Sequence, residues 1–246
     1  MTKKFKLNKA NTELLKESLI LIFFTLANYW FWQILKTSLT LCAILIILEL
    51  AIFKLSVRKN TKKRIIFYSG LIVFCILIFS VFGTKQRFDE TLAVNSPTEA
   101  HIINQRHGYL AEGLGIFFTN RVAQQYYVNW NPKIGKYLRN VSFAVDPNLY
   151  FYRSHPREKA GIDETEKYSP FVIPFFIIGI LFLITHAGNF PYLIIYLLLA
   201  VFITGFLDPK YILGPILVFP FINIVLYLGL TTTVTEVKKI IKHEEK

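Results

Sequence analysis

The chain has 246 residues, of which 53% are hydrophobic, 16% aromatic and 18% charged, and its formal net charge is +12. Soluble domains contain about 25% charged residues, so this composition is typical of a membrane protein. The positive charge does not indicate nucleic-acid binding, because the basic residues gather beside apolar segments, as topology signals do. Cys42 and Cys75 both lie inside apolar runs, which argues against a disulfide framework or a zinc site.

Six apolar runs reach or approach the length that a helix needs to cross the roughly 30 Å hydrocarbon core of a bilayer. They are Ser18–Leu35, Leu39–Leu55, Ile65–Phe82, Pro170–Thr185, Pro191–Phe206 and Tyr211–Leu230. Only "LKTS" (Leu35–Ser38) separates the first two runs, which predicts a tight turn. Trp30, Phe31 and Trp32 precede this turn, and we expect them in an aromatic belt at the membrane surface.

Lysines and arginines are concentrated before the first run, between the second and third runs, and after the last run. This distribution predicts an all-α protein of the inner (plasma) membrane, with six spans and both termini in the cytoplasm. We expect three helices in 1–83, a small extracytoplasmic helical domain in 84–169, three further helices in 170–230 and a cytoplasmic tail in 231–246.

The predicted outer domain contains several helix signals. Ser96, Pro97 and Glu99 mark the start of a helix that runs to about Leu110. Ile116–Trp130 is amphipathic at helical spacing. Asn131-Pro132 begins a further helix to about Ala144, which Asp146-Pro147 ends. We expect the aromatic residues of this domain to lean on the membrane surface.

The densest polar cluster lies in the sequence "DPNLYFYRSHPREKAG". His155 could act as an acid or base, and Arg157 could hold a phosphate group through two parallel hydrogen bonds. The alternative is an amphipathic loop that returns the chain to the fourth span, with its arginines near lipid head groups. The candidate lipid- or phosphate-binding residues are Tyr152, Arg153, His155, Arg157 and Lys159.

The sequence gives weaker evidence for a catalytic site or a metal site than for a phosphate-binding site. Asp89, Glu90 and Glu158 are the carboxylates that could serve as a catalytic base, but adjacent residues such as Asp89 and Glu90 point apart on a helix. His101 and His107 are not spaced to share one helical face, so we expect no metal site and no cofactor.

Three polar residues, Asn28, Glu49 and Asn223, lie inside the predicted spans. An ionisable group is costly within a membrane and is therefore a candidate for function. Glu49 lies towards the cytoplasmic end of its span, where Lys54 or Arg58 could neutralise it.

The sequence Tyr137–Ile184 carries a helix, an aspartate-proline turn, "LYFY", "SHPRE", an acidic "DETEKY" and a span with "PFFIIGI". It resembles uncharacterised bacterial multi-pass membrane proteins. The outer loop and the helix after it are also similar to membrane-embedded C-type glycosyltransferases of the dolichyl-phosphate-mannose and aminoarabinose kind. The resemblance covers Asn120–Ile184 and implies that Tyr152, His155 and Arg157 face a lipid-linked sugar. That family carries its catalytic acid in a long loop after the first span, whereas "LKTS" contains no Asp or Glu.

Three functions remain open from the sequence. The first is a cell-envelope membrane protein without catalysis of its own, which binds a lipid-linked precursor or a partner enzyme. The second is a minimal polyprenyl-phosphate-sugar glycosyltransferase that uses Asp89, Glu90 or Glu158 as its base. The third is a small transporter subunit, against which the scarcity of charge within the spans counts.

Overall fold

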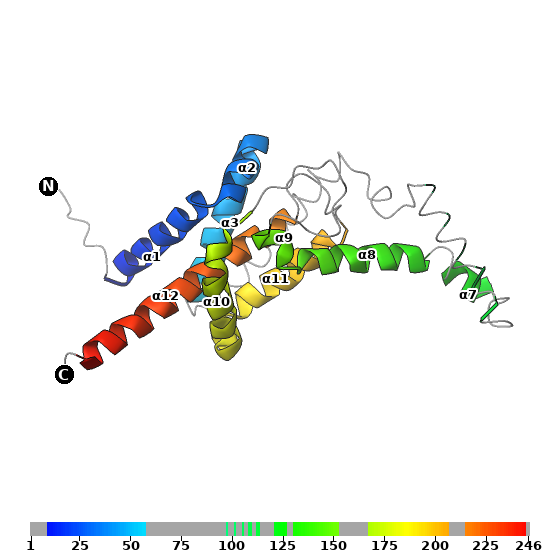
Figure 1. Ribbon diagram of the computed structural model, residues 1–246. Helices are drawn as coiled ribbons and strands as arrows, with labels where there is room; N and C mark the ends of the chain where they lie inside the picture. Colours follow the sequence, from blue (N-terminus) through cyan, green and yellow to red (C-terminus); the bar gives the residue numbers. More distant parts are fainter. Residues whose placement is uncertain are drawn as a thin grey trace. The chain divides into compact units, whose positions relative to one another are not determined.

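The computed structural model describes residues 9–57, 121–126, 130–152, 167–206 and 215–244, together with positions 97, 101, 105, 108, 109, 112 and 113. Every regular element in these ranges is helical, which confirms an all-α fold for this part of the chain (Figure 1). The predicted span Ile65–Phe82 and most of the predicted helix from Ser96 to Leu110 lie outside the described residues.

The α-helices of the described residues carry the labels of Figure 1, which run in chain order with a gap after α3. They are α1 (Lys9–Leu26), α2 (Tyr29–Thr37), α3 (Leu39–Val57), α7 (Arg121–Gln125), α8 (Asn131–Ala144), α9 (Asn148–Phe151), α10 (Ile173–Thr185), α11 (Pro191–Thr204) and α12 (Phe219–Glu244). Three short 3₁₀ helices precede the last three of these, namely η3 (Pro170–Val172), η4 (Ala187–Asn189) and η5 (Ile216–Val218).

Two helical segments among the described residues are long and apolar enough to cross a membrane, Leu39–Ser56 and Ile216–Lys242. A third is possible if Leu15–Leu26 and Tyr29–Thr37 form one span, although the two segments meet at 77°. Pro170–Thr185 and Pro191–Thr204 are apolar but shorter. By length and composition, the described residues therefore contain two helices that could cross a membrane, or three if the bent pair is one span.

The predicted span Ser18–Leu35 is not one continuous helix, because the chain breaks between α1 and α2. Asn28 has an extended backbone, with φ −90° and ψ 133°, and its side-chain oxygen accepts a hydrogen bond from the backbone N–H of Trp30. This is the geometry of a helix N-cap, so Asn28 starts a new helix within an apolar run. The break also places Trp30 and Phe31 in the protein core, while Trp32 stays 48% exposed. The expected aromatic belt therefore fails for the first two residues.

The last helix continues beyond the predicted span end at Leu230 and reaches Glu244. The polar residues after Leu230 include threonines whose hydroxyl groups donate hydrogen bonds to backbone carbonyls of the preceding turn, as Thr232 does to Leu228 and Thr233 to Gly229. Their side chains thus bond to the helix itself, which keeps a polar stretch helical. The predicted tail in 231–246 is, as far as Glu244, a continuation of α12.

The chain forms two compact units. The first consists of Met1–Thr61, Asp146–Ala200 and Ile212–Lys246, and the second of Lys62–Val145 and Val201–Tyr211. In the first unit α10 crosses α12 (Figure 1). A methyl group added at Gly229 would collide with the backbone carbonyl of Phe175, and one at Gly179 with that of Val225. Glycine is therefore required where the two helix backbones approach, as is common between membrane helices.

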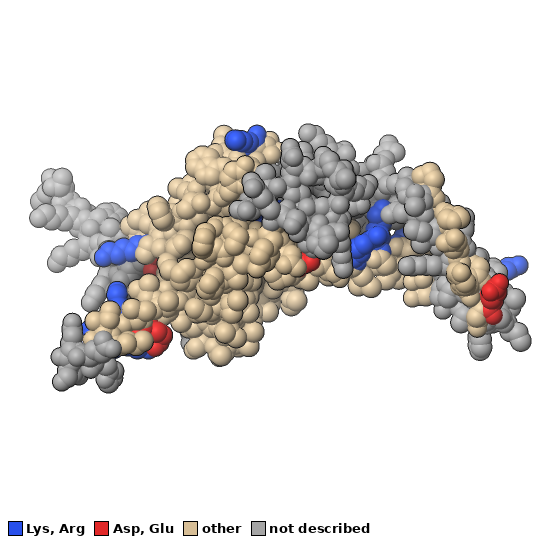
Figure 2. Space-filling view, viewed as in Figure 1, with Lys and Arg blue, Asp and Glu red and all other residues tan. Residues whose placement is uncertain are grey.

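The second unit has a small contact of its own. The Tyr137 hydroxyl donates to the carbonyl oxygen of Phe202 over 3.3 Å, and Asn140 Nδ2 donates to that of Gly205 over 3.1 Å. Both residues belong to α8, whose bounds Asn131–Ala144 confirm the helix predicted from Asn131-Pro132 and Asp146-Pro147. On the face shown in Figure 2, most of the described helical surface carries neither acidic nor basic side chains.

Candidate functional site

The structure describes one of the candidate lipid-binding residues. Tyr152 follows α9 in an extended conformation and is 51% exposed. The other candidate binding and catalytic residues lie outside the described residues; they are Arg153, His155, Arg157, Lys159, Asp89, Glu90 and Glu158. Their predicted roles therefore stay predictions, and the described geometry concerns the two ends of the segment that carries most of them.

The first end of this segment is the short helix α9. Asp146 Oδ1 accepts a hydrogen bond from the backbone N–H of Asn148 over 3.0 Å, and Pro147 fixes the backbone at the helix start. Leu149, Tyr150 and Phe151 are then buried, although Tyr152 is not. In the "LYFY" sequence, the first three side chains thus pack inside the protein and the fourth is exposed at its surface.

The second end returns to the same place. The backbone N–H of Tyr168 donates to the carbonyl oxygen of Tyr150 over 2.9 Å, and Lys167 Nζ donates to the carbonyl oxygen of Leu149 over 3.1 Å. Residues 153–166, which include the sequence "RSHPREKAG", lie outside the described residues, but the residues on either side of them are held together by a main-chain and a side-chain hydrogen bond. We call Leu149–Tyr152 and Lys167–Ser169 the loop base.

Trp30 packs beneath the loop base. Its ring centroid lies 5.7 Å from that of Tyr150 and 5.9 Å from that of Tyr168. Lys167 Nζ lies 5.8 Å from the centre of the Trp30 ring, within the range of a cation–π contact. The backbone N–H of Trp30 lies 2.9 Å from Asn28 Oδ1 and 3.3 Å from the carbonyl oxygen of Lys167. The helix cap at Asn28 thus positions the residue on which the loop base rests.

A buried polar cluster lies deeper in the same unit. Thr25 on α1, Glu49 on α3 and Asn223 on α12 are each less than 3% exposed. Thr25 Oγ1 lies 2.7 Å from Glu49 Oε1, and Asn223 Nδ2 lies 3.2 Å from Glu49 Oε2. Lys54, which the sequence offered as a neutralising residue, is exposed and forms no salt bridge with Glu49; Arg58 lies outside the described residues.

Tyr168 connects this cluster to the loop base. Its hydroxyl group donates a 2.8 Å hydrogen bond to Asn223 Oδ1, while its backbone N–H bonds to Tyr150. Burial raises the pKa of the Tyr168 hydroxyl well above its usual value, so the residue stays a neutral donor at physiological pH. One residue therefore takes part both in the closure of the loop and in the polar contacts around Glu49.

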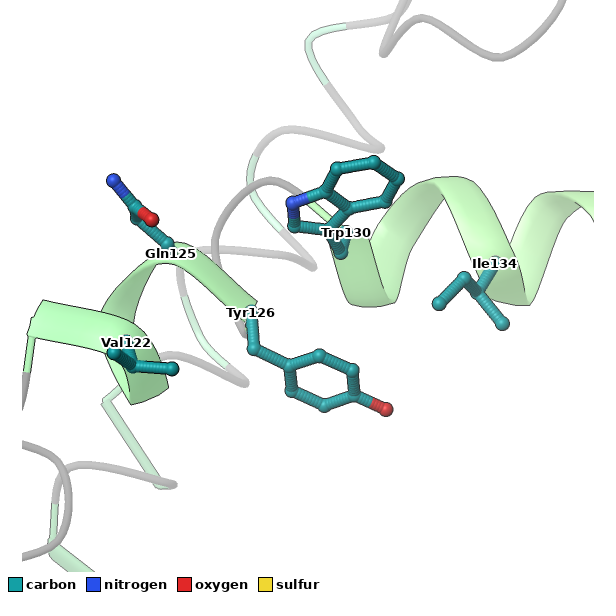
Figure 3. A pocket seen from close by; sticks show the side chains of 5 residues that line it. All are labelled: Val122, Gln125, Tyr126, Trp130 and Ile134. Atoms are coloured by element: carbon teal, nitrogen blue, oxygen red, sulfur yellow. The ribbon is translucent and has the colours of Figure 1, made fainter.

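An exposed apolar surface lies in the second unit. Val122, Tyr126, Trp130, Ile134 and Leu138 recur at every fourth residue and are each more than a third exposed. The first four, together with Gln125, line a shallow pocket (Figure 3). We call these five apolar residues the α7–α8 stripe. The sequence between Glu112 and Asp146 contains Arg121, Lys133, Lys136 and Arg139 but no acidic residue, so the surroundings of the stripe are basic.

Sequence reasoning identified Asn28, Glu49 and Asn223 because polar groups are rare in apolar runs. It missed Thr25 and Tyr168, which complete the cluster. A threonine in an apolar helix usually bonds to its own backbone, as Thr25 also does to Leu21. Tyr168 lies next to the predicted fourth span, where tyrosine is common. The sequence around Thr25 and Tyr168 therefore does not distinguish them from a threonine bonded to its own helix and a tyrosine at a membrane surface.

Comparisons with protein-family models, with curated proteins and with solved structures give no match for this chain. The resemblance to C-type glycosyltransferases that the residues of Tyr137–Ile184 suggest therefore stays a prediction.

Proposed function

We propose that this chain is an integral membrane protein of the cell envelope that binds the phosphate group of a lipid-linked precursor, without catalysis of its own. The binding residues are Tyr152, Arg153, His155, Arg157 and Lys159. The observation that supports this proposal is the loop base, because the backbone bond from Tyr168 to Tyr150 holds together the two ends of the segment that carries these residues.

The chemistry of the loop suits a phosphate at a membrane surface. Arginine forms two parallel hydrogen bonds with phosphate oxygens, and Arg153 and Arg157 each offer this geometry. Lys159 adds a point charge, and Tyr152 has a ring suited to the membrane interface. A loop whose ends are already held together loses less conformational entropy on binding than a free segment, which favours affinity.

The membrane arrangement is part of the same proposal. We assign six spans, cytoplasmic termini and an outer location for the loop, on the basis of the six apolar runs and the basic residues beside them. The α7–α8 stripe supports contact with lipid, since Trp130 and Tyr126 combine exposed rings with basic neighbours. Helices of this kind lie in the plane of the head groups and favour anionic lipids.

Mass spectrometry of lipids retained by the gently purified full-length protein tests the proposal. The samples are the wild type, His155→Ala/Arg157→Ala and the control Lys238→Ala/Lys242→Ala, in which two exposed lysines of α12 are removed. We expect the wild type and the control to retain a polyprenyl phosphate or its sugar conjugate, and the loop variant to lose it. Equal bulk phospholipid in all three samples would contradict the proposal, and retained partner protein without such a lipid would favour a partner enzyme.

Turnover is the second test. Purified wild type should not transfer sugar from a polyprenyl-phosphate sugar to an acceptor. Transfer that is lost in Glu90→Gln or Glu158→Gln would overturn the non-catalytic part of the proposal and identify the chain as a minimal transferase.

A further inference from the structure

The polar cluster of Thr25, Glu49, Asn223 and Tyr168 contains none of the proposed phosphate-binding residues. Glu49 is the one carboxyl group in it and is 2% exposed. It lies in the middle of α3, a helix long and apolar enough to cross a membrane. An ionisable residue held at such depth needs a physical explanation.

The number of hydrogens around Glu49 gives the first argument. Thr25 Oγ1 lies 2.7 Å from Glu49 Oε1 and 3.0 Å from the carbonyl oxygen of Leu21, but a hydroxyl group has one hydrogen to donate. Beside an ionised carboxylate, Thr25 can donate this hydrogen to only one of the two oxygens, and the other short contact is then left without a hydrogen. If Oε1 carries a proton, Glu49 donates to Thr25 and Thr25 donates to Leu21. Each hydrogen then has one acceptor.

The other carboxyl oxygen fits the same arrangement. Asn223 Nδ2 lies 3.2 Å from Glu49 Oε2 and donates to it as to a carbonyl oxygen. The amide is oriented by Tyr168, whose hydroxyl group donates to Asn223 Oδ1 and so keeps the Nδ2 side towards Glu49. Thr25, Asn223 and Tyr168 together satisfy a neutral carboxylic acid.

The charges around the cluster give the second argument. Among the described residues no Lys, Arg or His forms an ion pair with Glu49. Lys54 on α3 and Lys36 on α2 are exposed, and Lys167 directs its amino group to Leu149. The nearest titratable residues to Thr25 along α1 and to Asn223 along α12 are Glu17 and Tyr227, neither of which is cationic. A buried carboxylate without a cation is far more costly than a buried neutral acid.

We propose that Glu49 is a proton-binding site in the core of the helix bundle, where the bound proton lies between Glu49 Oε1 and Thr25 Oγ1 and Asn223 holds the other oxygen. The ligand is a proton rather than a metal ion, since two oxygens at direct hydrogen-bond distance leave no room for an ion between them. This site uses none of the proposed phosphate-binding residues, although Tyr168 belongs both to the cluster and to the loop base.

Infrared spectroscopy of the reconstituted full-length protein at neutral pH tests the proposal. We expect the wild type to show a carbonyl stretching band of a protonated carboxyl group, Glu49→Gln to lose it, and Glu236→Gln to keep it. Glu236 is a matched control because it is an exposed glutamate paired with Lys239 on the same protein. Absence of the band in the wild type, or its persistence in Glu49→Gln, would overturn the proposal.

Two further measurements keep the test decisive if Glu49→Gln fails to fold. Thr25→Val removes the acceptor of the proton but keeps the shape of the side chain, so the band should shift in frequency; an unshifted band would contradict the assigned position of the proton. Replacement of sodium by choline in the buffer should leave the wild-type band unchanged. A band that appears only without sodium would identify a cation site and overturn the proton assignment.

Discussion

The backbone N–H of Tyr168 donates a 2.9 Å hydrogen bond to the carbonyl oxygen of Tyr150, and this bond joins the two ends of the segment that carries the proposed phosphate-binding residues. The two residues are also neighbours of Trp30, which packs against both rings. Tyr168 further bonds to Asn223, which belongs to the polar cluster around Glu49. The loop base is therefore fixed by aromatic packing and by hydrogen bonds to the helices beneath it.

Trp30 is the residue on which the loop base depends most. Replacement by alanine removes a fully buried indole with three aromatic neighbours. We expect Trp30→Ala to lower the free energy of unfolding by about 3–5 kcal/mol, as large-to-small core substitutions do. Trp32→Ala is the matched control: Trp32 is half exposed and loses one hydrogen bond to Leu26, which costs about 1 kcal/mol. Unfolding in mixed detergent micelles, followed by circular dichroism, measures both, and equal losses would contradict the assigned core position.

Gly229 tests the crossing of α10 and α12. In Gly229→Ala the added methyl group meets the backbone carbonyl of Phe175, which cannot move without displacing its helix. We expect a loss of about 1–3 kcal/mol in unfolding free energy. Gly135→Ala makes the same change in α8, where the structure leaves open space, and should be neutral or stabilise by up to about 1 kcal/mol because alanine favours helix. A Gly229→Ala variant as stable as Gly135→Ala would show that the two helices do not approach this closely.

The pH dependence of stability tests the burial of Tyr168. Burial raises the pKa of its hydroxyl group in the folded protein, whereas an unfolded tyrosine ionises at about pH 10. The folded state therefore retains a proton that the unfolded state releases, so its stabilising contribution is complete below pH 10 and declines as the pH rises further. Tyr168→Phe should show a smaller decline, while Tyr152→Phe, at an exposed position, should behave as the wild type. Parallel curves for the wild type and Tyr168→Phe would refute the prediction.

The α7–α8 stripe should lie against lipid in the native membrane. In a Cys42→Ala/Cys75→Ala background, we expect Leu138→Cys to react several-fold more slowly with a water-soluble maleimide than Arg139→Cys does in proteoliposomes. The two positions are adjacent and both exposed on α8, so a difference reports the membrane and not the protein. The same pair should react equally after unfolding in detergent. Equal rates in proteoliposomes would place the stripe in water.

Local signals made some elements predictable. The bounds of α8 follow from Pro132 in its first turn and Asp146-Pro147 after its end, and these act through neighbouring residues alone. The break between α1 and α2 was missed because hydrophobicity continues across it. Its cause is one side chain, Asn28, which caps the next helix instead of lying inside a continuous span. Apolar composition therefore indicates which segments could be membrane helices but does not show where such a segment bends.

For the candidate site, too, some features could be predicted from the sequence and others could not. The sequence identified Glu49 and Asn223 as unusual, because polar groups in apolar runs are recognisable without a structure. It did not predict that they bond to each other, since 174 residues separate them in the chain. The hydrogen bond between Tyr150 and Tyr168 could not be predicted from the sequence either. It joins main-chain atoms, which every residue type has, so the residue types do not indicate it.

Direct binding of a polyprenyl phosphate to the purified protein tests the central claim, with the matching polyprenyl alcohol as the ligand that lacks the phosphate. We predict that the wild type binds the phosphate at least about tenfold more tightly than the alcohol, a difference of about 1.4 kcal/mol. Arg157→Ala should lose most of this preference, and Lys238→Ala should keep it. Equal affinity of the wild type for the two lipids would contradict the account.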